Sequence, residues 1–201
     1  ATTGIYTLSL HDALPISVLE QTDGDGRFDA DHFEGRMLNP GHAIEAAWFL
    51  LREARERAAL GRPCDGRIRA AALDMLDWMW EWGWDKEFGG ITYFKDVLGG
   101  PGVEYWHDMK FWWPQNEAAI AALMAYAETG EARWAERFGL VWDWAQARFP
   151  DRDCGEWYGY LHRDGTLSTD LKGNLYKGPF HVPRMYLVCL SLIPELLQRC
   201  R

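Results

Sequence analysis

The sequence predicts an all-α protein in which successive pairs of helices are separated by short β-hairpins. Apolar residues recur at spacings of three and four over several long stretches, which is the period of amphipathic helices. Gly and Pro residues mark the ends of these stretches. Two similar runs of aromatic residues, each introduced by a polar turn and a glycine, follow successive helix pairs.

We expect five helices. The first begins after Asn39-Pro40-Gly41 and ends before Gly61-Arg62-Pro63, and it carries Ile44, Trp48 and Leu51 on one face. The third ends at Thr129-Gly130, and the fourth stops before Pro150. The expected helical ranges are 42–60, 67–82, 114–128, 132–148 and 183–197.

Two hairpins are expected between these helices, at 84–93 and 151–160, with a glycine turn at Arg163-Asp164-Gly165 after the second. The order helix, helix, aromatic hairpin therefore repeats. A helical pair cannot bury its apolar face alone, so such a repeat implies stacking or a closed ring. Five helices are too few for a closed ring, which predicts that the chain is truncated.

The first seventeen residues, ATTGIYTLSLHDALPIS, match nothing that follows in period or composition. They resemble the translation of a widely used sequencing adapter, ATTEIYTLSLHDALPI, and differ from it over residues 1–16 only at Gly4. We interpret residues 1–17 as a non-native leader and exclude them from functional reasoning. Residues 18–201 are then expected to be the C-terminal half of a longer domain.

Composition narrows the class of function. The chain has 201 residues, a net charge of −9 and a pI of about 5.1, with no basic run. Nucleic acid and anionic membrane surfaces are therefore not expected as partners, because phosphate groups are bound by clustered Lys and Arg. The four cysteines are scattered without a CxxC pair, which predicts reduced thiols and a cytoplasmic protein.

Three segments carry candidate chemistry. His42 and Glu45 are three residues apart at a helix start, so they share one face and can touch, although a histidine that merely caps a helix would occupy the same position. Glu117 lies one turn after Trp113 on an otherwise apolar helix, where it could equally complement the helix dipole. His181 begins the last helix between two prolines and three residues before Arg184, an arrangement that a plain Pro-terminated loop would also produce.

The remaining histidines, His32, His107 and His162, lie in polar loops and are interpreted as surface residues. The sequence contains no HExxH, P-loop, GxSxG or dinucleotide fingerprint, so metal-dependent proteolysis, phosphate-loop chemistry and triad hydrolysis have no support. The residues alone thus predict a helical repeat protein with two candidate histidines and two carboxylates.

Four segments, taken in order, resemble the N-acylglucosamine 2-epimerase (renin-binding protein) family. They are NPGHAIEAAWFLL (39–51), KFWWPQNEAAIAALMAY (110–126), GEWYGYLHRDG (155–165) and KGPFHVPRM (177–185). The similarity extends from about residue 24 to residue 193. The resemblance implies the second half of an (α/α)6 barrel, in which two rings of helices surround a sugar-binding cleft.

The resemblance also implies a mechanism, in which a proton is removed from carbon 2 of an open-chain sugar and returned on the other face. His42 and His181 match the two proton-transfer positions of the family, and Glu45 and Glu117 match its supporting carboxylates. Trp113 and Arg184 are expected to line the substrate site. No metal or cofactor is implied, and a nucleotide effector cannot be judged from the sequence.

The family also uses an arginine from its N-terminal half that has no counterpart here, so we expect the 201-residue chain to be inactive or nearly so. The favoured reaction interconverts N-acetylglucosamine and N-acetylmannosamine. Cellobiose or mannose 2-epimerisation and aldose–ketose isomerisation stay open, as do glycoside hydrolysis through Glu45 and Glu117 and a non-catalytic carbohydrate- or protein-binding module. An opened barrel would expose an apolar edge, which is compatible with a homodimer.

Overall fold

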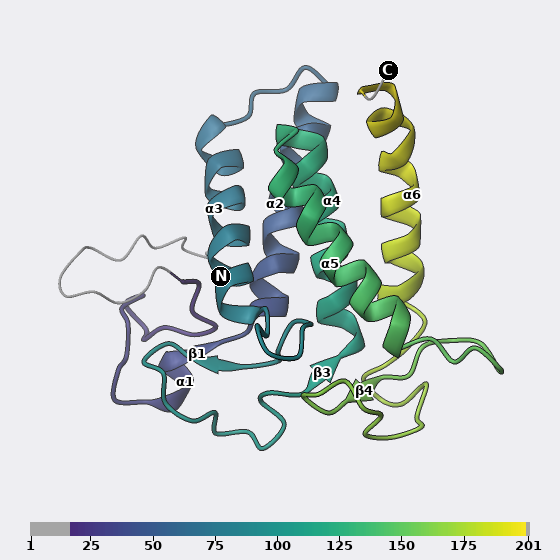
Figure 1. Ribbon diagram of the computed structural model, residues 1–201. Helices are drawn as coiled ribbons and strands as arrows, with labels where there is room; N and C mark the ends of the chain where they lie inside the picture. The colour runs from purple at the N-terminus through teal and green to yellow at the C-terminus, as the bar shows by residue number, and fades with distance from the viewer. Residues whose placement is uncertain (1–16, 200–201) are drawn as a thin grey trace.

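The computed structural model describes residues 17–199 and consists mainly of long helices that stand above a layer of loops (Figure 1). The predicted leader, apart from Ser17, lies outside the described residues, and its non-native origin stays a prediction. The long helices are α2 (Pro40–Ala59), α3 (Gly66–Gly83), α4 (Trp112–Thr129), α5 (Ala132–Arg148) and α6 (His181–Arg199). A single turn, α1 (Phe33–Arg36), was not predicted.

All five predicted helices are therefore present in the described residues, and α5 has the predicted bounds. Their ends follow from local chemistry. The Asn39 side chain accepts a hydrogen bond from the His42 backbone at the start of α2, and Asp65 does the same from Arg67 at the start of α3. Gly130 ends α4 in the left-handed conformation, with φ of 71°.

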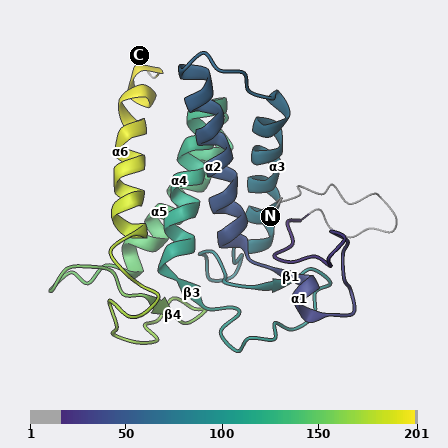
Figure 2. The same ribbon diagram turned by 180° about the vertical axis from the view of Figure 1, so that it is seen from behind.

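The helices form two layers (Figures 1 and 2). Helices α2, α4 and α6 run side by side in the same direction, while α3 and α5 return on one side of them. Helix α4 is buried along nearly its whole length, and its alanines permit close approach of the neighbouring helices. Because α2, α4 and α6 are parallel, their N-terminal ends meet at the same end of the molecule, beside the loop layer.

The strands correct one prediction. The segments expected as local hairpins are closed by single bridges, Trp84 with Ile91 and Pro150 with Trp157. The two-residue ladders instead join distant segments. They pair β1 (Met37–Leu38) with β2 (Lys95–Asp96), and β3 (Lys110–Phe111) with β4 (Tyr160–Leu161), both antiparallel. Since β1 and β3 lead directly into α2 and α4, this pairing fixes where those two helices begin.

The two predicted hairpin segments nevertheless share one turn. The Asp85 carboxylate accepts hydrogen bonds from the backbone of residues 87 and 88, and the Asp151 carboxylate does so from residues 153 and 154. Gly89 and Gly155 close the turns at positive φ. The aromatic residues that follow reach different partners: Trp157 stacks on Phe149 across its own turn, whereas Tyr160 packs on Phe111 of β3.

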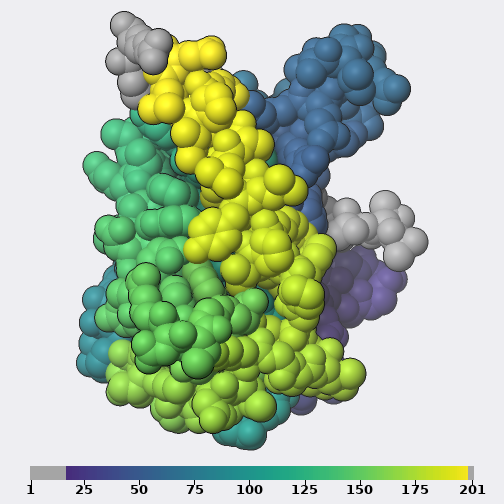
Figure 3. Space-filling view, turned by 90° about the vertical axis from the view of Figure 1, so that its right-hand side faces the viewer, coloured from purple at the N-terminus to yellow at the C-terminus, as the bar shows by residue number. Residues whose placement is uncertain are grey.

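Helix α6 lies at the surface of the molecule (Figure 3), where it exposes several leucines. Leu187, Leu190 and Leu197 are each at least 60% exposed. Among residues 17–199, no helix combines the length and the apolar character needed to cross a membrane. Cys64 and Cys154 are exposed and Cys189 is buried, and all three are free thiols.

Candidate functional site

The six residues predicted for the site come together where α2, α4 and α6 begin. His42 lies in the first turn of α2, Trp113 in the first turn of α4, and His181 opens α6. Three helix N-termini therefore point toward the same region, and their dipoles favour negative charge there. His42 and His181 are far apart in the sequence, and the packing of α4 against both α2 and α6 brings them together.

Trp113 joins the two histidines. Its ring stacks on the His42 imidazole with centroids 4.9 Å apart, and it lies 5.7 Å from the His181 ring. Gly41 makes the first contact possible, because a Cβ at this position would lie 2.6 Å from the Trp113 indole. The Asn-Pro-Gly-His order thus caps α2, starts it with a proline and leaves room for the indole beneath His42.

The Nδ1 of His42 donates a hydrogen bond to Glu20, with 2.7 Å between Nδ1 and Oε1. The sequence pointed to Glu45 as the neighbour of His42, but Glu45 forms an ion pair with Arg184 instead. The hydrogen bond to Glu20 raises the pKa of His42 against the opposing effect of burial, and the charge of Glu45 adds to the rise. Glu20 lies in no helix or strand, so no periodic pattern drew attention to it.

His181 has a different and more buried partner. Its Nδ1 donates to the Oε1 of Glu117 at 2.8 Å, and the Glu117 side chain is completely buried. The other carboxylate oxygen of Glu117 accepts a hydrogen bond of 2.8 Å from the indole of Trp48 on α2. With Nδ1 held by a carboxylate in both histidines, Nε2 is the nitrogen that each can offer to a substrate.

Arg184 completes the cluster around Glu117. Its Nη2 lies 2.7 Å from Glu117 Oε1 and 3.2 Å from His181 Nδ1, and it also binds Glu45. Glu45, Glu117 and His181 could between them hold a metal ion, since one ligand atom from each lies within 4.8 Å of the others. The guanidinium of Arg184 already contacts all three, so a cation would have to displace it.

The structure thus brings together His42, Glu45, Trp113, Glu117, His181 and Arg184, the six residues singled out from the sequence. Sequence reasoning missed two further members, Glu20 and Trp48. Trp48 was assigned only to an apolar helix face. Its indole N–H needs an acceptor when buried, and that need was the available signal.

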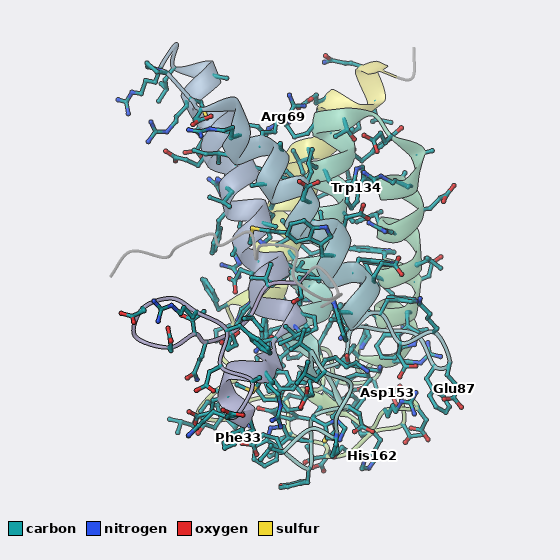
Figure 4. The ribbon with its side chains drawn as sticks, turned by 90° about the vertical axis from the view of Figure 1, so that its left-hand side faces the viewer. Phe33, Arg69, Glu87, Trp134, Asp153 and His162 are labelled. Atoms are coloured by element: carbon teal, nitrogen blue, oxygen red, sulfur yellow. The ribbon has the colours of Figure 1, made fainter. Side chains whose placement is uncertain are left out.

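Other polar features lie away from this cluster. His162 lies in the loop layer together with Glu87 and Asp153, while Arg69 and Trp134 lie farther up the helices (Figure 4). A hollow of about 570 Å³ opens at the opposite end of α2 and α4, beside Arg69 and Glu128, and none of the six predicted residues lines it. His32 and His162 are exposed, as expected for surface residues, and His107 is half-buried.

A second buried charge cluster ties the loop layer to α4. Lys110, immediately before α4, is fully buried with its Nζ 2.9 Å from the Asp85 carboxylate, which Arg163 also binds. Burial lowers the pKa of Lys110 to about 8, although Asp85 opposes this shift. Burial also opposes ionisation of Asp85, but hydrogen bonds from Arg163 and Lys110 outweigh it and hold the pKa of Asp85 well below its usual range.

Residues 17–178 match the N-acylglucosamine 2-epimerase (GlcNAc 2-epimerase) family. A protein of Bos taurus named N-acylglucosamine 2-epimerase is 42% identical over 184 residues, which are 91% of this chain and 42% of the bovine protein. The chain spans about two fifths of the length of the curated relatives it matches.

Two solved structures share the fold. A D-mannose isomerase matches with a TM-score of 0.68 and 21% identity, over 77% of this chain and 37% of its own. The cellobiose 2-epimerase of Spirochaeta thermophila matches with a TM-score of 0.67 and 24% identity, over 80% of this chain and 39% of its own. The prediction of a partial (α/α)6 barrel is confirmed.

Proposed function

Because the chain belongs to the N-acylglucosamine 2-epimerase family, we propose that it carries the proton-transfer groups of a sugar 2-epimerase. The proposed reaction interconverts N-acetylglucosamine and N-acetylmannosamine. One observation carries the proposal: His42 and His181 flank the same indole, each with Nδ1 bound to a carboxylate and Nε2 free for a substrate.

The chemistry starts at carbon 2 of the open-chain sugar. The hydrogen there is acidic because the electrons it leaves delocalise onto the neighbouring aldehyde oxygen and form an enolate. One imidazole removes this proton, and the other, protonated, returns a proton to the opposite face. The roles exchange in the reverse direction. The three helix N-termini at the site favour the negative charge of the enolate.

Glycoside hydrolysis through Glu45 and Glu117 is disfavoured by the geometry. Both carboxylates bind the same nitrogen of Arg184, and Glu117 is completely buried with its oxygens engaged by Trp48, His181 and Arg184. A hydrolase needs its two carboxyl groups on either side of the scissile bond, one of them able to deliver a proton. The proposal therefore assigns these carboxylates to the support of the site.

The chain spans 42% of the length of its Bos taurus relative, and we propose the activity for a protein of that relative's length. The isolated 201-residue chain is expected to be inactive or nearly so, because the further arginine expected from the resemblance has no counterpart in it. We also propose that the protein acts in the cytoplasm and that a sugar is its substrate. The homodimer stays a prediction, and we propose the exposed leucines of α6 as the apolar edge that it would cover.

The test uses a chimera in which residues 18–201 of this chain replace the matching part of the Bos taurus relative. The chimera is incubated with N-acetylglucosamine in heavy water, and NMR follows the signal of the proton on carbon 2. We expect deuterium at carbon 2 together with N-acetylmannosamine, and no N-acetylmannosamine in the His42→Gln and His181→Gln variants. The Glu56→Gln variant, which changes an exposed pair with Arg52, is the matched control.

Mannose and cellobiose serve as parallel substrates. Exchange with one of these sugars and none with N-acetylglucosamine would keep the two-histidine mechanism but change the substrate. Appearance of a ketose would make the reaction an aldose–ketose isomerisation. Sugar binding without exchange on any of the three would refute the epimerase proposal in favour of a binding module.

A further inference from the structure

The segment before α1 approaches the site from outside the helical layers. The backbone N–H of Glu20 donates to the carbonyl of Met37 at 2.9 Å, and Val18 N–H lies 3.4 Å from the sulfur of Met79 on α3. These contacts hold the segment alongside β1, just before α2 begins. Glu20 is thereby brought to His42 although 22 residues separate them.

The His42 ring is held from two directions. Trp113 of α4 stacks on one face with an interplanar angle of 28°, and Glu20 binds Nδ1 at 2.7 Å. Glu45, one turn farther along α2, is engaged by Arg184. Arg184 in turn contacts Glu117 and His181, so Glu45 belongs to the cluster of the other histidine.

We propose that Glu20 is the positioning residue of His42, and that it fixes the tautomer and orientation of this imidazole in the role that Glu117 has for His181. Its catalytic meaning rests on the proposed function, whereas the contact itself does not. The two histidines are then unequal by construction. His181 depends on a carboxylate with no exposure, while the side chains of His42 and Glu20 are 51% and 26% exposed.

The charges around His42 agree with this assignment. Two carboxylates act on it, Glu20 from the preceding segment and Glu45 from α2, and both raise its pKa, with the hydrogen bond from Glu20 the largest contribution. The Tyr93 hydroxyl, whose pKa is raised by burial and by Glu20, belongs to the same surroundings. Removing Glu20 should therefore affect His42 more than removing Glu45.

The test is a histidine NMR titration of the 201-residue chain, in which the His42 signal is assigned by its loss in His42→Gln. In Glu20→Gln we expect the pKa of His42 to fall toward 6.5, while Glu56→Gln leaves it unchanged. An unchanged pKa in Glu20→Gln, or a larger fall in Glu45→Gln, would overturn the proposal. If Glu20→Gln does not fold, nitrogen-15 spectra of the unsubstituted chain, recorded above the pKa of His42, identify the tautomer of its neutral imidazole. A proton on Nδ1 supports the Glu20 assignment, and a proton on Nε2 refutes it.

The catalytic consequence is measured separately in the chimera. Glu20→Gln should lower kcat by about 10- to 100-fold with little change in KM, by analogy with the loss seen when the hydrogen-bond partner of a metal-ligating histidine is removed. The limb of the pH profile that belongs to His42 should move to lower pH. If the pKa of His42 does not fall in Glu20→Gln, the Glu20 assignment is refuted. If that pKa falls as expected but the chimera shows no turnover, only the epimerase proposal is refuted.

Discussion

Glu117 and Arg184 form the central ion pair of the site, with 2.7 Å between Glu117 Oε1 and Arg184 Nη2. Glu117 comes from α4, the most buried helix, and Arg184 comes from α6, at the edge of the helical layer. The same carboxylate oxygen also accepts from His181, and the other accepts from Trp48. One buried carboxylate therefore connects all three parallel helices.

Glu117→Gln should be strongly destabilising, because it removes the charge that Arg184 and His181 face in a buried setting. We expect the free energy of unfolding to fall by about 3 kcal/mol, at the lower end for breaking a buried pair. Urea denaturation measures the change. Glu131→Gln, which loses an exposed pair with Arg133, should cost less than about 1 kcal/mol. Equal losses in the two variants would contradict the central role of Glu117.

Gly41→Ala tests the contact between α2 and the indole. The added methyl would lie 2.6 Å from the Trp113 ring, so the ring must shift from its present position against His42. We expect a loss of about 1–3 kcal/mol in stability, as for overpacked cores, and a shift of the His42 imidazole proton signals as the stacking is lost. Thermal unfolding and proton NMR report these two effects.

Gly139→Ala is the control for that substitution. Gly139 lies inside α5, and no atom lies within 4 Å of an added Cβ. The substitution should raise stability by about 0.5–1 kcal/mol, since alanine favours a helix over glycine. If Gly41→Ala also left stability unchanged or raised it, the close contact between Gly41 and the Trp113 ring would be contradicted.

Stability should depend on pH through His42. Glu20 favours the imidazolium, so the pKa in the folded state lies above 6.5. The stabilisation is then complete below pH 6.5 and is lost as the pH rises through the folded-state pKa. Because both side chains are partly exposed, its size should stay below about 1 kcal/mol. Urea midpoints of the unsubstituted chain and Glu20→Gln should differ more at pH 5.5 than at pH 8.5; the reverse order would contradict the raised pKa.

Asp85→Ala should lower the free energy of unfolding more than a substitution of an exposed residue in the loop layer does. It leaves the fully buried Lys110 without its carboxylate, at a cost of about 3–5 kcal/mol. Glu87 binds the same Arg163 but is 64% exposed, so Glu87→Ala should cost less than about 1 kcal/mol. Guanidinium denaturation distinguishes the two, and similar midpoints would show that the buried pair is not what holds this layer.

The sequence was sufficient for the helices because their signals are local. Capping by Asn39 and Asp65, the apolar period and the stop at Gly130 all act within a few residues of the helix that they define. Strand pairing was not predictable in the same way. The partner of β3 lies some fifty residues away, and a two-residue ladder has too little pattern to identify it.

The site shows the same division. The six predicted residues lie together, as the resemblance of their segments to one family implied. The contacts among them depend on tertiary packing, which the segments do not specify. The spacing of His42 and Glu45 favoured a contact on one helix face, whereas Arg184, brought in by α6, binds Glu45. Glu20 carried no signal, because a single carboxylate in an irregular segment resembles any surface residue.

The position of α6 at the edge has a consequence for how the site can be lost. Helix α6 packs mainly on α4, and its other side is apolar and open. His181 and Arg184 both belong to its first turn, so partial detachment of this one helix removes an imidazole and a guanidinium from the candidate site in a single event. The integrity of the site then follows the local opening of α6, as hydrogen exchange would record it, and can fail while α2, α3 and α4 remain folded.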